Sequence, residues 1–162
     1  MRQQMQRFID PIIRRLSLLL GRGIIRRVDD SKPGQACQAS FLEEEVRDGM
    51  ERQQEYGFTS VPLPGCNAVA VFPIGDRSHG VIVATEDYRY RPVNLKPGEV
   101  CIYTHEGARV HLKAGKIVEI VADEVHFTGN LQADGDIKAG SISLRGHVHP
   151  ENDSGGPTSP PM

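Results

Sequence analysis

From residue 96 to residue 144 the sequence alternates between very short apolar stretches and glycine-containing turns. This spacing predicts repetitive β-structure with short strands at 100–104, 109–112, 117–121, 124–127, 130–133, 136–138 and 141–144. Each strand has only two or three apolar side chains, such as Val110 and Leu112. Burying a methylene group contributes about 0.8 kcal/mol, whereas ordering a residue costs about 1–2 kcal/mol. One copy therefore forms hardly any core, and we expect three copies to wind around one axis.

A pair of histidines follows the last of these strands, in the motif Gly146-His147-Val148-His149-Pro150. Alternate side chains of an extended chain point to the same face, so His147 and His149 project together. A tetrahedral ion needs two more ligands and an octahedral ion four, but the chain nearby adds only the polar residues 151–153. Three copies about one axis would supply six imidazoles, which suit iron, nickel, cobalt or zinc. Without that symmetry, the two histidines are an ordinary surface pair near a terminus.

Residues 1–20 have apolar side chains spaced three and four apart, with arginines between them, as in an amphipathic helix. We expect this helix to begin or break at Pro11. It should pack on its own protein or on a partner, and a membrane surface is the alternative. Arg14 and Arg15 interrupt the apolar stretch and no small-residue cleavage site follows, so the segment is not a signal peptide.

Residues 21–94 are predicted to form a small antiparallel barrel. Apolar runs at 68–72 and 80–85 are typical of buried strands. Turn-forming residues separate the strands, and no strand–helix–strand alternation is visible. About five strands fit into this span, which is the size of an OB-type barrel. The predicted fold class is therefore all-β, an N-terminal OB-type barrel followed by repetitive β-structure that three copies share.

The composition excludes several classes of protein. The net charge of -2 and the pI near 6.3 give no basic footprint for nucleic acid. Cys37, Cys66 and Cys101 are far apart, which favours free thiols and synthesis in a reducing compartment over a disulfide framework. We expect Cys66 and Cys101 to be small core residues. The apolar runs are too short to span a membrane.

Several pieces of the sequence, taken in their order, resemble one family: the central spike, or baseplate assembly protein V, of contractile-tailed phages, in particular its Mu-like branch. The resemblance covers most of the chain from about residue 21 onward. Between residues 123 and 144 only the repetitive pattern of short apolar stretches and glycine turns is similar. The pieces lie at 20–25, 54–60, 75–80, 87–92, 97–100, 103–107, 111–113 and 146–150.

The resemblance implies a homotrimer whose barrel is followed by an intertwined trimeric β-helix needle with a metal-bound tip. Together with the predicted helix, the chain then has four parts. These are an N-terminal helix at 1–20, an OB-type barrel at 21–94, a triple-stranded β-helix at 95–140 and a metal-binding apex at 141–162. At the apex, His147 and His149 of each chain would hold one iron ion per trimer through six histidine ligands. Related spikes also hold calcium and chloride near the axis, and no motif here assigns residues to those ions.

The resemblance also implies a mechanical role and no enzymatic one. Sheath contraction would drive the spike into the host outer membrane. The protein would be made in the host cytoplasm and would lie at the baseplate tip of the virion tail. Its partners would be baseplate hub and tail-tube proteins, with no nucleic acid among them.

Two other functions are compatible with parts of the sequence. An OB-type barrel can bind oligonucleotides or saccharides. Tyr88 and Tyr90 alternate with arginines, and their rings could stack on bases. A metallohydrolase is the weaker alternative, because the arrangement of His147, His149 and Asp153 is only similar to a metallo-β-lactamase motif. In this sequence the aspartate is displaced and the following histidine is absent.

Overall fold

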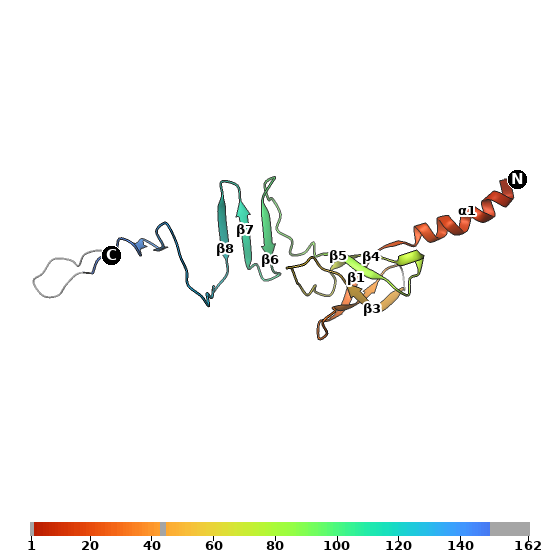
Figure 1. The fold of residues 1–162 in the computed structure, drawn as a ribbon, viewed down its shortest axis with the longest axis horizontal. Helices are drawn as coiled ribbons and strands as arrows, with labels where there is room; N and C mark the ends of the chain where they lie inside the picture. The colour runs from red at the N-terminus through yellow and green to blue at the C-terminus, as the bar shows by residue number, and fades with distance from the viewer. Residues whose placement is uncertain (1, 43–44, 150–162) are drawn as a thin grey trace, which may run out of the picture. The chain divides into compact units, whose positions relative to one another are not determined.

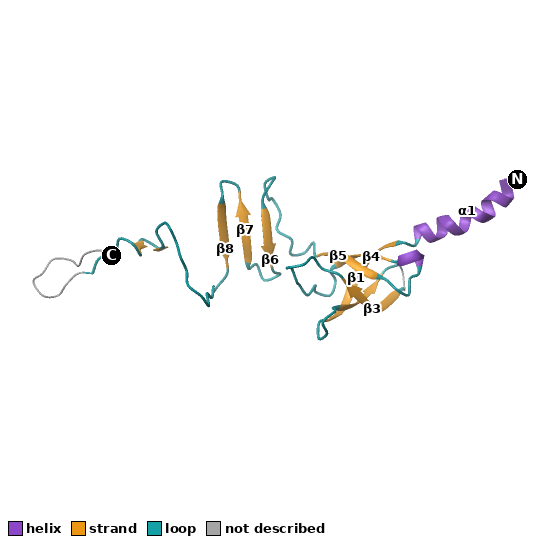
Figure 2. Cartoon of the chain, in the orientation of Figure 1, coloured by secondary structure: helices purple, strands orange, loops and turns teal. Residues whose placement is uncertain are grey.

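The computed structural model describes residues 2–42 and 45–149, and the chain divides into two compact units, Met1–Ala122 and Asp123–Met162. Strands make up most of the regular structure of the described residues (Figure 1, Figure 2). Helical structure there consists of α1 (Arg2–Ser17) and the single turn η1 (Pro73–Gly75). This agrees with the predicted all-β class. Within the described part of the chain, neither of these helices is long and apolar enough to cross a membrane.

Helix α1 runs through Pro11 instead of beginning or breaking there. Proline removes one backbone hydrogen bond and costs about 3 kcal/mol in a helix interior, yet the helix continues on both sides of Pro11. Arg14 and Arg15 lie in the last turn, where cations interact favourably with the helix dipole. The helix ends against η1, where a side chain at Gly75 would come within 2.8 Å of the Arg15 carbonyl oxygen.

Five strands form a closed barrel in the order β1-β2-β3-β5-β4. They are β1 (Leu20–Asp29), β2 (Ala36–Ser40), β3 (Val46–Arg52), β4 (Asn67–Val71) and β5 (Val81–Glu86). Four of the pairings are antiparallel, but β3 and β5 run parallel. The predicted barrel is thus present, with one parallel pair where only antiparallel pairs were expected. The long β3–β4 connection makes this possible, because β4 crosses over to pair with β1 and β5 closes the gap.

Small and large side chains alternate in the barrel core. Every second residue of β2 and β4 points inward, and several of these are alanines that let the larger side chains interdigitate. Gly23 in β1 leaves room for the Phe41 ring, because a side chain at this position would lie 2.8 Å from it. The buried apolar residues are Ile25, Cys37, Ala39, Met50, Cys66, Ala68, Ala70, Phe72 and Ile82.

A three-stranded antiparallel sheet follows the barrel in the sequence, in the order β6-β7-β8. It is built from β6 (Val100–Tyr103), β7 (Arg109–Lys113) and β8 (Ile117–Val121). Tight glycine turns join the strands, and Val110 of β7 pairs with Ile102 on one side and Ile120 on the other. All three strands lie where the sequence predicted them.

The second unit contains one small two-stranded sheet, formed by β9 (Lys138–Ala139) and β10 (Ile142–Ser143). The predicted strands at 124–127 and 130–133 are absent from the described chain. A strand needs a neighbour for its backbone hydrogen bonds, and residues 2–42 and 45–149 of a single copy offer none to these two segments. The strand predictions there are therefore wrong for the isolated chain.

Candidate functional site

The two predicted metal-binding histidines lie next to each other after β10. The ring centroids of His147 and His149 are 5.1 Å apart, and the rings are nearly perpendicular. The backbone that places them there is not the extended strand that the sequence predicted. Residues 144–146 form a turn instead, and the His147 N–H donates to the Ser143 carbonyl oxygen at 3.1 Å. The pairing of the two rings therefore arises from a turn.

The hydrogen bonds of His147 leave one of its ring nitrogens available to a ligand. Nδ1 lies 3.0 Å from the carbonyl oxygen of Ser143 and 3.1 Å from that of Leu144. Carbonyl oxygens only accept hydrogen bonds, so Nδ1 carries the proton and the lone pair of the neutral ring is on Nε2. Histidines that bind metals usually donate from their other ring nitrogen in this way. The arrangement at His147 thus fits a metal ligand.

A network around Asp136 holds the turn that positions His147. The Asp136 carboxylate accepts hydrogen bonds from the Ser143 hydroxyl at 2.8 Å and from the Arg145 N–H at 3.2 Å. The Gly146 N–H in turn donates to the Ser143 hydroxyl oxygen at 2.9 Å. The sequence did not point to Asp136 and Ser143, because polar residues are common throughout this repeat.

One chain does not supply a complete metal site within the described residues. No group of three or more histidine, cysteine, aspartate or glutamate side chains gathers there in an arrangement that could hold a metal ion. Glu151, Asn152 and Asp153, the nearby polar residues noted in the sequence, lie outside the described residues. A metal bound by His147 and His149 therefore needs ligands beyond those that the described part of one chain provides.

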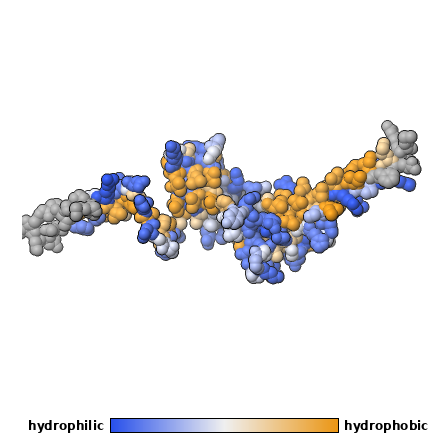
Figure 3. Space-filling view, in the orientation of Figure 1, coloured by the Kyte–Doolittle hydropathy of each residue, from blue (hydrophilic) through white to orange (hydrophobic). Residues whose placement is uncertain are grey.

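One face of the β6-β7-β8 sheet is entirely aliphatic. Residues that pair directly across strands share a face, and the register joins these side chains into one surface, the aliphatic face. Each of them is 36–60 % exposed, and Figure 3 shows apolar surface over these strands. The members are Val100, Ile102, Val110, Leu112, Val118 and Ile120.

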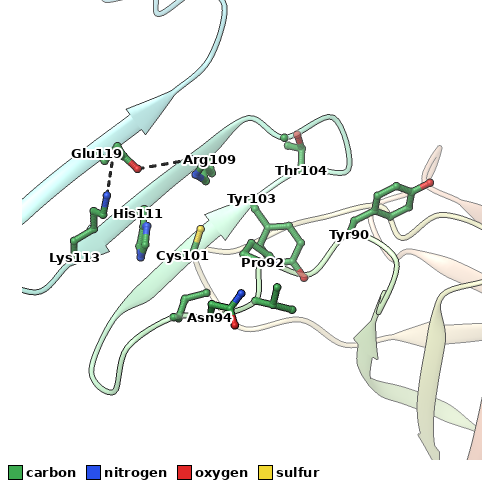
Figure 4. Close-up of a pocket in the computed structure, with 13 residues that line it drawn as sticks. Tyr90, Pro92, Asn94, Cys101, Tyr103, Thr104, Arg109, His111, Lys113 and Glu119 are labelled. Atoms are coloured by element: carbon green, nitrogen blue, oxygen red, sulfur yellow. Dashed lines mark hydrogen bonds and ion pairs between the residues drawn. The ribbon is translucent and has the colours of Figure 1, made fainter.

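The opposite face of the same sheet has the charged residues, which pair with one another, together with Ile117 and Val121 of β8. It lines a cavity of about 440 Å³ together with the segment 90–95 (Figure 4). Glu119 there binds Lys113 at 3.0 Å and lies 3.8 Å from Arg109. The charged groups on this face thus have partners within the sheet. The aliphatic face, whose side chains remain exposed, is the side of the sheet that lacks a covering layer.

Glu99 connects the turn before β6 to the rest of the sheet through hydrogen bonds. Its carboxylate accepts hydrogen bonds from the backbone N–H groups of Lys96 and Ala114 at 3.0 and 3.2 Å. These two donors are the main reason why the pKa of Glu99 lies below its ordinary value. The same carboxylate lies 3.3 Å from the buried Nε2 of His111. We read these contacts as structural, because they tie the strands of one sheet together.

Comparison with known proteins identifies relatives over nearly the whole chain. The family described as "Bacteriophage Mu Gp45, N-terminal" matches residues 22–89. The baseplate puncturing device gp45 of Escherichia phage Mu is 37% identical, over 96% of this chain and 95% of that protein. The Mu-like prophage FluMu protein gp45 of Haemophilus influenzae is 31% identical, over 92% of this chain and 96% of that protein. Both similarities extend well past the barrel.

Proposed function

This chain belongs to the bacteriophage Mu Gp45 family of baseplate spike proteins, and from that premise we propose that three copies of it form the spike that punctures the host outer membrane during sheath contraction. The family is a structural one, so the protein is a component of a phage tail baseplate and not an enzyme. The metallohydrolase alternative is therefore dropped. Residues 144–146 and the paired histidines accordingly have an assembly role in this proposal.

The barrel of this spike is of the OB type in our proposal. A five-stranded closed barrel with strand order β1-β2-β3-β5-β4 and one parallel closure between β3 and β5 supports that assignment. OB barrels often bind oligonucleotides or saccharides. Here the net charge of -2 opposes nucleic acid binding, and we assign the barrel to contacts with baseplate hub and tail-tube proteins.

The observation that carries the proposal is the aliphatic face of β6-β7-β8. Large apolar patches on soluble proteins mark interaction sites. Removing the remaining exposed half of six aliphatic side chains from water contributes about 1 kcal/mol for each, or roughly 6 kcal/mol per chain. Three chains around one axis can cover all three faces at once, and β6 and β8 then gain neighbours for their free edges.

The needle would continue through residues 123–140. Val125, Phe127 and Leu131 in this stretch are exposed in the single chain, and no strand of its described residues pairs with them. An intertwined triple-stranded β-helix would supply both an apolar core and hydrogen-bond partners from the other two copies. A closed, interlocked β-structure without free edges suits a component that is pushed through a membrane.

At the tip, His147 and His149 of three chains would hold one iron ion. The proton on Nδ1 of His147, fixed by two carbonyl oxygens, supports ligation through Nε2. Six neutral imidazoles suit a late first-row divalent metal, and the family resemblance favours iron among these. The bound ion would cross-link three chains close to their ends, where fraying otherwise begins.

A single aspartate on the aliphatic face tests the trimer. Val110→Asp would bring three carboxylates to the shared core, and an unpaired buried charge costs several kcal/mol. Ile117→Asp is the matched control, because Ile117 pairs with Lys113 on the opposite face of the same sheet. We expect sedimentation equilibrium to give a trimer for the unchanged chain and for Ile117→Asp, and a monomer for Val110→Asp. A monomeric unchanged chain, or a stable Val110→Asp trimer, would contradict the proposal.

A further inference from the structure

Helix α1 has an apolar stripe that its own chain leaves uncovered. Met5, Ile9, Ile12 and Leu16 follow one another at intervals of four, three and four residues, which places them on one side of a helix. All four side chains are 41–60 % exposed, and Figure 3 shows apolar surface along α1. An uncovered stripe of this length calls for a partner.

The spacing of the stripe is that of a coiled-coil seam. In a heptad, Ile9 and Leu16 occupy the a positions and Met5 and Ile12 the d positions. Arg7 and Arg14 then both fall on f, the position farthest from the seam. Pro11 falls on c, also outside the seam, so its ring does not interrupt the packing of the a and d side chains. The apolar residues at a and d, and the arginines and the proline outside them, are thus all consistent with a single coiled-coil seam.

The identity of the core residues indicates how many helices share the seam. Isoleucine at both a and d shifts the preference of parallel coiled coils from two strands to three or four. Ile9 is at a and Ile12 at d. Ile13, at the neighbouring e position, is also exposed, and it widens the apolar surface as a core of more than two helices requires. A pair of helices would leave part of this surface in water.

We propose that α1 helices of three copies pack as a parallel three-stranded coiled coil on the N-terminal side of the barrels. The inference rests on the trimeric spike proposed above. A helix of 16 residues, about 24 Å long, is too short to associate firmly alone. A trimer raises the effective concentration of the three helices. The close approach of Arg15 to Gly75 fixes the end of each helix to its own barrel.

Cysteine cross-linking in the full chain tests the seam. Ile12→Cys places thiols at d, in the core of the coiled coil, and Arg14→Cys places them at f, on its outside. With a mild oxidant, we expect most of the Ile12→Cys protein to migrate as a disulfide-linked dimer on non-reducing gels. Arg14→Cys should cross-link several-fold less. The unchanged chain, which keeps Cys37, Cys66 and Cys101, measures the background. Leu16→Cys, at a, repeats the test in case one variant folds poorly.

The oligomeric state of the same samples separates this inference from the proposed function. A trimer in which Ile12→Cys cross-links no better than Arg14→Cys overturns the coiled coil and leaves the spike intact. A monomer in every sample overturns both. Sedimentation with vesicles of phosphatidylcholine and phosphatidylglycerol tests the membrane surface. Tight binding by the unchanged trimer, without cross-linking of Ile12→Cys, would assign the stripe to lipid and overturn the inference.

Discussion

The guanidinium group of Arg77 binds the carboxylate of Glu45 through two nitrogens, with the shortest contact at 2.6 Å. The two residues come from different loops of the barrel, one before β3 and the other before β5. The guanidinium also lies 4.2 Å from the centroid of the buried Phe72 ring. Both charged side chains are largely shielded, at 14 % and 21 % exposure. The pair therefore closes two loops over one end of the core.

We predict that this ion pair makes the free energy of unfolding of the barrel depend on pH, with a loss of stability at low pH. The hydrogen bond from Arg77 is the main reason why the pKa of Glu45 lies below its ordinary value of 4.5. A carboxylate with a lowered folded-state pKa stabilises the protein above its unfolded pKa, and that contribution is lost as the pH falls through the folded value. Glu45→Gln should lower the free energy of unfolding by about 1–3 kcal/mol near neutral pH.

Urea denaturation followed by circular dichroism, at a series of pH values, measures this effect. The difference between Glu45→Gln and the unchanged chain should shrink toward zero in strong acid, where Glu45 is protonated in both states. Glu55→Gln is the control, because Glu55 is exposed and its change should be small at every pH. A difference that stays constant down to acid pH would contradict the role of the Glu45 charge.

The metal prediction concerns the tip. The double change His147→Ala and His149→Ala should abolish binding of one metal ion per three chains and leave the barrel folded. Elemental analysis by mass spectrometry measures the metal, and circular dichroism monitors the barrel. Because ligation requires neutral imidazoles, acidification of the unchanged protein should release the ion as protons compete for the ring nitrogens. Full metal occupancy in the double variant would exclude these two histidines as ligands.

The three thiols should differ in reactivity. Cys37 and Cys66 are buried in the barrel core, and burial raises the pKa of both thiols. Cys101 is half-buried and lines the cavity on the face of the β6-β7-β8 sheet opposite the aliphatic face. A disulfide reagent should therefore modify one thiol quickly in the native protein and all three in denaturant. Cys101→Ser should remove the fast phase, and a fast phase that survived this change would show that the barrel opens.

Much of the barrel could be predicted because its sequence pattern is local. The apolar runs at 68–72 and 80–85 located β4 and β5, where β4 alternates between buried and half-buried residues and β5 fully buries only Ile82. The ion pair between Glu45 and Arg77 could not be predicted, since the residues are 32 positions apart. The contact depends on how two loops of the barrel close, and no local sequence pattern encodes that.

The candidate site was predicted in part. The sequence predicted that His147 and His149 lie together, but it assumed an extended strand, and the turn before them depends on Asp136 and Ser143. The strands expected at 124–127 and 130–133 do not form in one chain, because a pattern of apolar residues cannot specify which molecule supplies the neighbouring strand. The repeat pattern correctly located β6, β7 and β8, whose partners are close in sequence.

The last prediction concerns which part of the chain holds the trimer together. The aliphatic face lies on β6-β7-β8, whereas the barrel buries its own core with Ile25, Phe72 and Ile82. A fragment of residues 96–162 should therefore be trimeric and resistant to protease. A fragment of residues 1–92 should be folded but mostly monomeric at low concentration, because α1 alone is too short to hold three chains. Analytical ultracentrifugation of both fragments decides the matter. A trimeric barrel fragment beside an unfolded, monomeric 96–162 fragment would mean that assembly begins at the barrel, and the central claim about the aliphatic face would be wrong.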